Sequence, residues 1–180
     1  MNGKPVRYLI DQHGTTVDSN IVFRSNGKGF ISKGNNTFTN NIFVDIRSNT
    51  RVGTINTHQR GYIVFPYGDI QGSVIQRNIF ISREPGQKII THGINKSRGD
   101  GGYLWECKAD NNLYWNTEDP NWADDFLKEM RNKGVELNSI SSDPGFMDLD
   151  GGDFRLKSDS WARKLGIVEI HINDAGLIAY

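Results

Sequence analysis

Carboxylates recur along the first hundred residues, in or beside segments that read as turns. The set that neighbouring repeat units could bring together is Asp45, Asp69, Glu84 and Asp100. Two carboxylates held about 5 to 9.5 Å apart can serve as a general acid and a nucleophile or base in hydrolysis. Asp45 follows an apolar run and Asp100 lies in the glycine-rich stretch 97–102. We therefore take Asp45 and Asp100 as candidate catalytic carboxylates, with a turn role as the alternative for Asp45.

Basic and imidazole side chains in the same part of the chain are candidates for ligand binding. They are His58, Arg60, Arg83 and His92. The planar guanidinium of arginine suits bidentate contacts with carboxylates, and both side-chain types can bind hydroxyl-rich molecules. Glu106, which opens the fourth repeat unit described below, is a further carboxylate that could face a ligand.

Composition argues against several other kinds of partner and site. The 180 residues carry 21 basic and 21 acidic side chains without a basic block, which disfavours nucleic acid as a partner. Cys107 is the single cysteine, so we predict neither a disulfide nor a cysteine zinc site. The acidic run 148–153 lacks the glutamate that completes an EF-hand loop and reads as a turn. We predict no metal and no cofactor, and no apolar run is long enough for a membrane helix.

A motif built around asparagine recurs four times and must position these residues. The segments are TTVDSNIVFR at 15–24, NTFTNNIFVDI at 36–46, SVIQRNIFIS at 73–82 and KADNNLYWNT at 108–117. They align on Asn20, Asn41, Asn78 and Asn112, and each asparagine precedes apolar residues. A motif of strand, turn and strand at such a period is typical of stacked solenoids.

The spacings between the aligned asparagines are 21, 37 and 34 residues. The first fits one coil of a parallel β-helix, and the others fit a coil with an inserted loop on one face. Asparagine tolerates the left-handed backbone of a sharp turn, and its amide can bond to the equivalent asparagine above and below. Unrelated hairpin turns are the alternative, although glycine does not follow these asparagines.

The last third of the chain changes character. Residues 121–134 predict an amphipathic helix with Asn121 as N-cap, whose apolar face (Trp122, Phe126, Leu127 and Met130) should pack against the side of the solenoid. Strands are predicted at 145–148 and 153–157, and Ser160 caps a helical turn at 161–165. We interpret this tail as the closing cap. The prediction is one all-β domain, with coils at 1–118 and the helix and cap at 119–180.

The tail reads SDPGFMD at 142–148, GGDFRLKSDS at 151–160, LGI at 165–167 and DAGL at 174–177. This resembles the C-terminal signature of bacterial right-handed parallel β-helix proteins. It looks most like the C-terminal part of glycoside hydrolase family 141, with neighbours among the pectate-lyase-like β-helices. The resemblance implies a right-handed single-stranded parallel β-helix with one short amphipathic α-helix and a C-terminal cap.

The resemblance also implies activity on plant or microbial polysaccharides, through paired carboxylates on one face of the solenoid. Asp11 matches an acidic residue that precedes the first such unit in similar proteins, which makes it the first catalytic candidate. Its alternative role is to initiate the turn that contains His13, a candidate sugar ligand. Similar proteins often carry a histidine-rich string where this chain reads GFISK at 29–33, which weakens the case for an intact site.

Two classes of function therefore remain open. The chain is either a glycoside hydrolase or a non-catalytic carbohydrate-binding or structural β-helix piece, while a polysaccharide lyase would need a base beside clustered acids. The first apolar strand, at 6–10, has no cap before it, which suggests a fragment, a homo-oligomer or a partner chain over an open first coil. The first residues lack the apolar core of a signal peptide, whereas the resemblance suggests a secreted or periplasmic protein.

Overall fold

The structure is a computed structural model that describes residues 14–24, 30–31, 34–46, 61–65, 70–84, 86–92, 94–95, 99–100 and 102–171. In this part of the chain most elements are short strands in parallel sheets, and helices are few. The arrangement is consistent with an all-β parallel solenoid. The strand expected at 6–10 lies outside the described residues.

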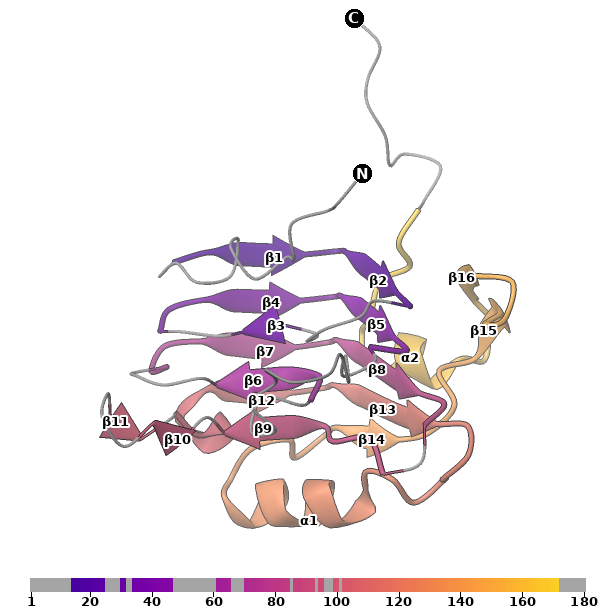
Figure 1. Cartoon of the computed structure of the whole chain (residues 1–180). Coiled ribbons are helices and arrows are strands. Elements are labelled where there is room, and N and C mark those ends of the chain that lie inside the picture. The colour runs from indigo at the N-terminus through magenta and orange to yellow at the C-terminus, as the bar shows by residue number, and fades with distance from the viewer. Residues whose placement is uncertain are drawn as a thin grey trace, which may run out of the picture.

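The first sheet, which we call sheet A, contains the strand that precedes each repeated asparagine. Its order is β1 (Thr16–Asp18), β4 (Thr37–Thr39), β7 (Val74–Gln76) and β12 (Lys108–Asp110), and every pair is parallel. Figure 1 shows these strands stacked one below the other, with β1 uppermost.

The second sheet, sheet B, contains the strand that follows each asparagine. Its strands are β2 (Ile21–Phe23), β5 (Ile42–Val44), β8 (Ile79–Ser82), β13 (Leu113–Asn116) and β14 (Ile140–Ser141), again all parallel. A third parallel sheet consists of β3 (Phe30–Ile31), β6 (Ile63–Phe65) and β9 (Ile90–His92). Two antiparallel pairs complete the strands: β10 (Ile94–Asn95) with β11 (Gly99–Asp100), and β15 (Phe146–Asp148) with β16 (Asp153–Leu156).

The repeated asparagines form a hydrogen-bonded ladder at the corner between sheets A and B, as the sequence predicted. The backbone N–H and Nδ2 of Asn20 donate to Oδ1 of Asn41 at 3.0 and 3.1 Å, and Asn41 donates in the same way to Asn78. Asn78 donates to Asn112 at 2.9 and 3.1 Å. Asn41, Asn78 and Asn112 are fully buried, so each bond replaces one that water would otherwise make.

The turn itself differs from the prediction in one residue. The left-handed backbone belongs to the residue before each ladder asparagine, with φ between 55° and 57° at Ser19, Asn40, Arg77 and Asn111. The ladder asparagine is therefore free to follow extended geometry and direct its amide along the stack. The residues at the left-handed position all line the groove described below.

The lower end of the ladder is closed by Glu136 and Ser139. Ser139 occupies the next ladder position and its Oγ accepts the backbone N–H of Asn112 at 2.8 Å. Asn112 Nδ2 donates to the carboxylate of Glu136 at 3.0 and 3.2 Å. The carboxylate oxygens of Glu136 accept these bonds, so Glu136 supplies the acceptor that another asparagine would have supplied.

An apolar core fills the space between the three sheets. Phe43, Phe80 and Tyr114 stack along it, with ring centroids 5.4 and 5.1 Å apart, and Phe126 meets Tyr114 edge-on at 5.3 Å. These contacts follow from the register, since β5, β8 and β13 pair Phe43 with Phe80 and Phe80 with Tyr114. Aromatic pairs in these geometries add to the stabilisation from burial alone.

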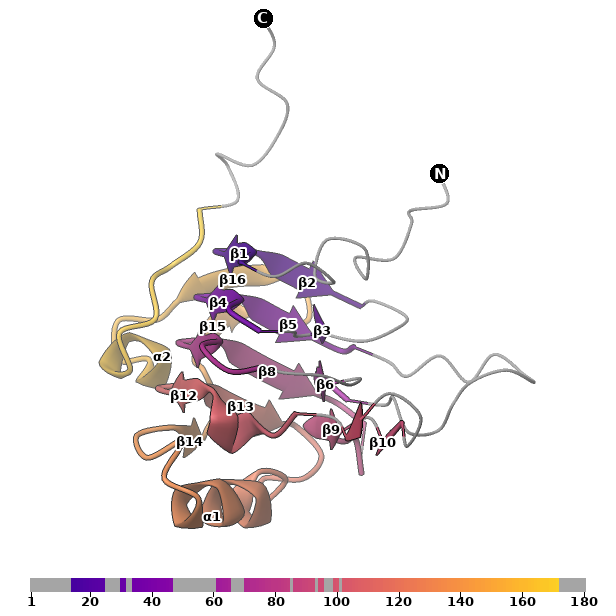
Figure 2. The ribbon, with the colours of Figure 1, turned by 90° about the vertical axis from the view of Figure 1, so that its left-hand side faces the viewer.

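The helix α1 (Asp124–Asn132) is shorter than predicted and lies elsewhere. Its N-cap is Ala123 rather than Asn121, and no side chain caps it. Leu127 and Met130 are buried in the core, with Trp122 and Phe126 packed beside them, so the predicted apolar face is confirmed. Figures 1 and 2 show α1 lying across the lower end of the stack, below β14, rather than along its side.

The tail after β14 turns back along the outside of sheet B, as Figure 2 shows. Its helix α2 (Trp161–Lys164) has Ser160 as N-cap, as predicted, with Oγ accepting the N–H groups of Ala162 and Arg163. A second core cluster joins the tail to the outer side chains of sheet B; it contains Ile42, Val44, Ile79, Ile81, Leu113, Phe146, Phe154, Leu156, Ala162 and Ile167. Helix α1 therefore covers the end of the stack, and the tail covers the outer face of one sheet.

Candidate functional site

The outer face of sheet A is polar and is the face that the tail leaves uncovered. Side chains alternate along a strand, so the middle residues Val17, Phe38, Ile75 and Ala109 face the core. The residues on either side form two outward rows that follow the register of the sheet: Thr16, Thr37, Val74 and Lys108, then Asp18, Thr39, Gln76 and Asp110. Hydroxyl, carboxylate, amide and ammonium groups thus repeat at the strand spacing of about 4.8 Å.

A groove of about 540 Å³ lies between the asparagine corner and the tail, and Asp18 and Thr39 of the second row reach it; we call it the turn groove. One wall holds the left-handed turn residues, and the other is the backbone at 165–168. Its lining is Asp18, Ser19, Thr39, Asn40, Arg77, Asn111, Leu165, Gly166 and Val168. The volume falls within the range of small-ligand sites, and the lining mixes donors and acceptors.

The β1 end of the turn groove is fixed by its own hydrogen bonds. The Asp18 carboxylate accepts the hydroxyls of Ser19, at 2.9 Å, and of Thr39. Asn40 Nδ2 donates to Ser19 Oγ at 3.2 Å, and Asn40 Oδ1 accepts the backbone N–H of Val168 at 2.7 Å. This last bond ties the tail to the corner and so sets the width of the groove.

The β7 and β12 end of the turn groove has polar groups without such bonds. Among the described residues, no carboxylate pairs with Arg77 and no hydrogen bond engages the Asn111 side chain. Arg77 is exposed, and its aliphatic stem lies beside Gly166, where a Cβ would stand 3.8 Å from Arg77 Cδ. The two donors follow adjacent strands, so they lie about one strand spacing apart.

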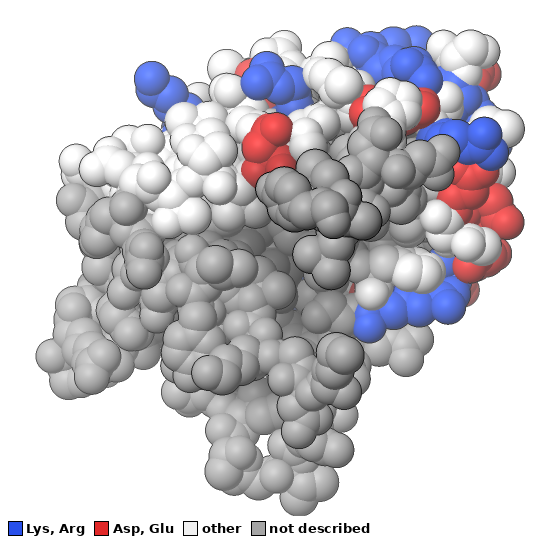
Figure 3. All heavy atoms as spheres, turned by 90° about the horizontal axis from the view of Figure 1, so that it is seen from above, with Lys and Arg blue, Asp and Glu red and all other residues white. Residues whose placement is uncertain are grey.

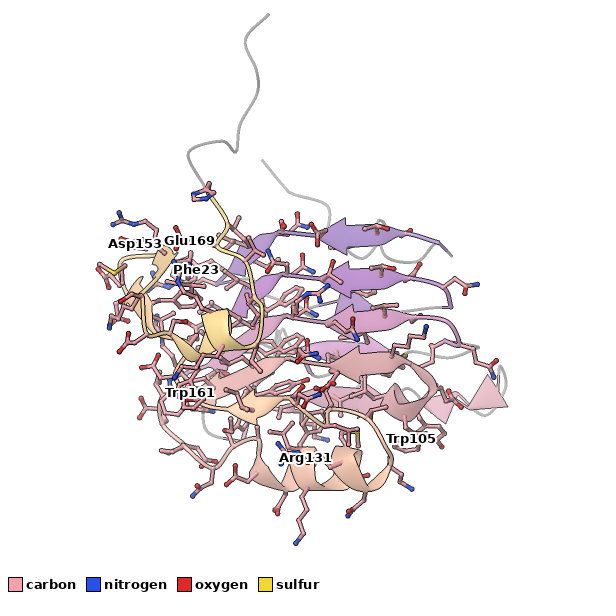
Figure 4. The ribbon with its side chains drawn as sticks, turned by 180° about the vertical axis from the view of Figure 1, so that it is seen from behind. Phe23, Trp105, Arg131, Asp153, Trp161 and Glu169 are labelled. Atoms are coloured by element: carbon pink, nitrogen blue, oxygen red, sulfur yellow. The ribbon has the colours of Figure 1, made fainter. Side chains whose placement is uncertain are left out.

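Figure 4 looks onto sheet A from behind and shows how aromatic groups flank it. Trp105 lies beside β12 on the side away from the tail, whereas Trp161 lies in the tail itself, at the start of α2. Tyr103 and Trp105 stack with ring centroids 4.5 Å apart and nearly parallel planes, and Lys133 Nζ lies 4.9 Å from the Trp105 ring. Tyr103 is partly exposed, so an aromatic surface adjoins one end of the polar face.

The two carboxylates on the open face of sheet A are too far apart to act as a glycosidase pair. Asp18 is on β1 and Asp110 on β12, three strand spacings apart, or about 14 Å. Retaining and inverting enzymes hold their carboxyl groups about 5 to 9.5 Å apart. Asp110 is also engaged, since both of its oxygens accept 2.7 Å bonds from Asn138.

Two of the predicted site residues, Asp45 and Arg83, lie together at the far end of sheet B. Arg83 Nε is 3.3 Å from Asp45 Oδ2, at ion-pair distance but without hydrogen-bond geometry, and Nη1 is 2.6 Å from Asp150 Oδ1. Arg83 Nη2 donates to the carbonyl of Leu149 at 3.3 Å. Asp45 is buried and has a left-handed φ of 51°, so Arg83 connects a strand end to the turn between β15 and β16. This geometry matches the turn role given as the alternative for Asp45.

In the part of the chain that the structure describes, the other predicted site residues do not join the cluster of Asp45 and Arg83. Asp100 is in β11 and His92 is in β9, in different sheets. Asp11, His13, His58 and Arg60 lie outside the described residues, as does Asp69. Glu106 Oε2 accepts the backbone N–H of Tyr103 at 3.0 Å, which closes the 3₁₀ turn η3 (Leu104–Glu106).

Glu136 was not predicted, although it is a fully buried carboxylate. Burial raises its pKa to about 7, and hydrogen bonds from Ser139, Asn112 and Tyr114 oppose that shift. Tyr114 Oη donates to Oε1 at 3.0 Å, and Ser139 Oγ donates to Oε2. The sequence signal for this residue was the fifth repeat, NSIS at 138–141. Serine stands there at the ladder position, so another side chain has to accept the hydrogen bond from the Asn112 amide.

The surface and the remaining chemistry add three findings. Figure 3, a view from above, shows Lys and Arg side chains next to Asp and Glu side chains on the described surface, rather than a patch of one sign. Across the described ranges, three or more histidine, cysteine or acidic side chains never converge as metal ligands would. Within the same ranges, no helix is long and apolar enough to span a bilayer.

Comparisons with protein-family models, with curated proteins and with solved structures gave no match to this chain.

Proposed function

We propose that this chain is part of a right-handed parallel β-helix protein that binds a polysaccharide along the open face of sheet A and the turn groove. The observation that carries the proposal is the contrast between the two faces: the tail buries the outer side of sheet B, and the outer side of sheet A keeps two polar rows. The resemblance of the tail to family 141 glycoside hydrolases supports the same class of ligand.

The regular spacing of polar side chains on the outer face of sheet A suits a polymer better than a single small molecule. Threonine, glutamine, aspartate and lysine side chains recur on adjacent strands at about 4.8 Å, so hydroxyl-rich units of an extended chain can meet equivalent groups in succession. The stacked pair Tyr103 and Trp105 offers an apolar surface of the kind that sugar rings pack against. A ligand that follows the stack would meet both features.

Binding is favoured over hydrolysis by the carboxylate geometry. Cleavage of a glycosidic bond needs two carboxyl groups about 5 to 9.5 Å apart, and Asp18 and Asp110 are about 14 Å apart. Hydrolysis by a pair that includes Asp11 was the first expectation from the sequence. It stays a prediction, and the conversion of Asp11 to asparagine with an assay for new reducing ends tests it.

The experiment for binding is isothermal titration of the protein with soluble polysaccharides of different backbones. The double variant Thr37→Ala/Gln76→Ala removes hydrogen-bonding groups from both rows and should weaken binding roughly three- to tenfold, from about 1 kcal/mol of lost hydrogen bonding. The control Asn132→Ala removes an exposed polar group from α1 and should leave binding unchanged. Equal affinities for the double variant and the wild type would contradict the proposal, and release of reducing ends would show that the protein is an enzyme.

A further inference from the structure

Arg77 is the cation that the fold leaves available in the turn groove. Other basic side chains near the tail are engaged: Arg163 bonds to Glu169 at 2.7 Å, and Arg83 is paired with Asp45 and Asp150. Arg155 is paired with Asp153. In the described part of the chain, Arg77 alone lines the turn groove with a charged donor group that no carboxylate engages.

The position of Arg77 is set by the backbone and not by a partner side chain. It is the left-handed residue of the third turn, with φ of 55°, and its exposed side chain lines the turn groove. Contact with Gly166 in the tail supports its aliphatic stem. Such a geometry leaves the guanidinium at the groove surface with its donors open.

Asn111 provides a second donor at the same end of the groove. It is the left-handed residue of the next turn, one strand spacing below Arg77, and it too lines the groove. A planar guanidinium and an adjacent amide together can bind two oxygens of one anionic group. The lining thus changes along its length, from an acidic end at Asp18 to a cationic end at Arg77.

None of the acidic side chains near Arg77 in the described part of the chain pairs with it. Asp18 is two strand spacings away, about 9 to 10 Å, and its carboxylate accepts the hydroxyls of Ser19 and Thr39. Asp110, on the adjacent strand, keeps its charge, but both of its carboxylate oxygens are directed to Asn138. Glu169 is paired with Arg163 on the other side of the tail.

We propose that the Arg77 and Asn111 end of the turn groove is a subsite for an anionic substituent, a carboxylate or a sulfate, on the bound polysaccharide. This inference rests on the proposed function and names the class of glycan. Charge-assisted hydrogen bonds to arginine are roughly twice as strong as neutral ones, so acidic glycans should bind more tightly than neutral glycans of the same backbone.

The test compares three soluble cellulose derivatives that share one backbone: hydroxyethyl, carboxymethyl and sulfated cellulose. The wild type should bind the anionic forms at least about tenfold more tightly than the neutral form at low salt, and the preference should shrink as salt rises. The variant Arg77→Gln should lose the preference and keep its affinity for the neutral form. The control Lys128→Gln removes an exposed positive charge from α1 and should keep the preference.

The outcomes separate this inference from the proposed function. Equal affinity of the wild type for neutral and anionic forms would overturn the subsite and leave polysaccharide binding standing. A preference that survives Arg77→Gln would also overturn it. Failure of all three cellulose derivatives to bind would overturn the subsite as proposed, whereas the proposed function is overturned only if none of the polysaccharide backbones in the first titration binds. The carboxymethyl and sulfated arms show which anion the subsite takes, since a preference for either one supports it.

Discussion

Sheets A and B are built from the same repeats, yet the tail covers the outer face of sheet B and leaves the outer face of sheet A uncovered. In sheet B the outward residues are apolar: Val44 and Ile81 are completely buried under the tail. In sheet A the outward residue Thr16 lies opposite Thr37 and then Val74, and Val74 is not part of the core cluster that joins the tail to sheet B. The difference shows that the repeat specifies one buried interior, while the composition of each outer row decides whether that face is covered or left open.

The largest expected loss of stability follows from removing a tail side chain that covers sheet B. Phe154 is almost fully buried and meets Phe23 and Phe146 edge-on, at 5.4 and 5.3 Å. Phe154→Ala should lower the free energy of unfolding by about 3 to 5 kcal/mol, because it removes buried apolar area and leaves a cavity. Val74→Ala, an outward change on sheet A, should cost less than about 1 kcal/mol. Denaturant titration measures both, and similar losses for the two variants would contradict the difference between the faces.

The next largest effect is a pH dependence of stability that comes from Glu136, at the end of the asparagine ladder between the two sheets. The pKa of Glu136 is raised from 4.5 to about 7, so the native state holds a proton that the unfolded chain has released in that interval. The contribution of Glu136 to the free energy of unfolding should therefore be greatest below about pH 4.5 and should fall by up to about 3 kcal/mol as the pH rises to about 7. Glu136→Gln should remove this dependence, measured by denaturant titration at pH 5 and pH 8.

Exposed Glu129 on α1 provides the matched control for that change. Glu129→Gln should leave the pH dependence of the wild type intact. If Glu136→Gln unfolds with the same pH profile as the wild type, the carboxylate does not close the ladder in the way that its contacts with Asn112, Tyr114 and Ser139 indicate.

The ladder was predictable because its signal is local and repeated. Asn20, Asn41, Asn78 and Asn112 recur in equivalent surroundings, and stacked amides are the simplest way to satisfy them. Its lower end was missed because the closing acceptor, Glu136, comes three residues before the ladder position rather than at it. The prediction assigned the left-handed backbone to the ladder asparagine, whereas the residue before it adopts that conformation. The sequence did not separate the two positions, because polar residues that tolerate the turn occupy both.

The tail was interpreted as the closing cap, whereas α1 covers the end of the stack and the tail covers sheet B. The sequence carries a signal for this place: the segments after the asparagines are continuously apolar, as in IFV at 42–44, whereas those before them alternate, as in TFT at 37–39. A continuous run indicates a strand buried on both faces, so something must cover sheet B. The open polar face of sheet A follows from the same alternation, but the turn groove does not, because its second wall comes from residues more than fifty positions after the last turn residue.

The smallest expected effect tests whether the cover of sheet B can be loosened without disturbing sheet A. Ser160 Oγ donates to the carbonyl of Pro144 at 2.6 Å and accepts the N–H of Ala162 at 3.0 Å, so it joins the start of α2 to the strand pair of the tail. Ser160→Ala should cost about 1 to 2 kcal/mol, the usual loss for a helix N-cap. Amide hydrogen exchange should accelerate in the tail at 161–168, while protection of β4 and β7 in sheet A stays at its wild-type level, because the tail contributes no strand to that sheet. Ser158→Ala, an exposed serine two residues earlier, should change neither. Faster exchange in β4 and β7 would mean that the cover of one sheet supports the other, and that the open face of sheet A depends on the tail for more than the wall of its groove.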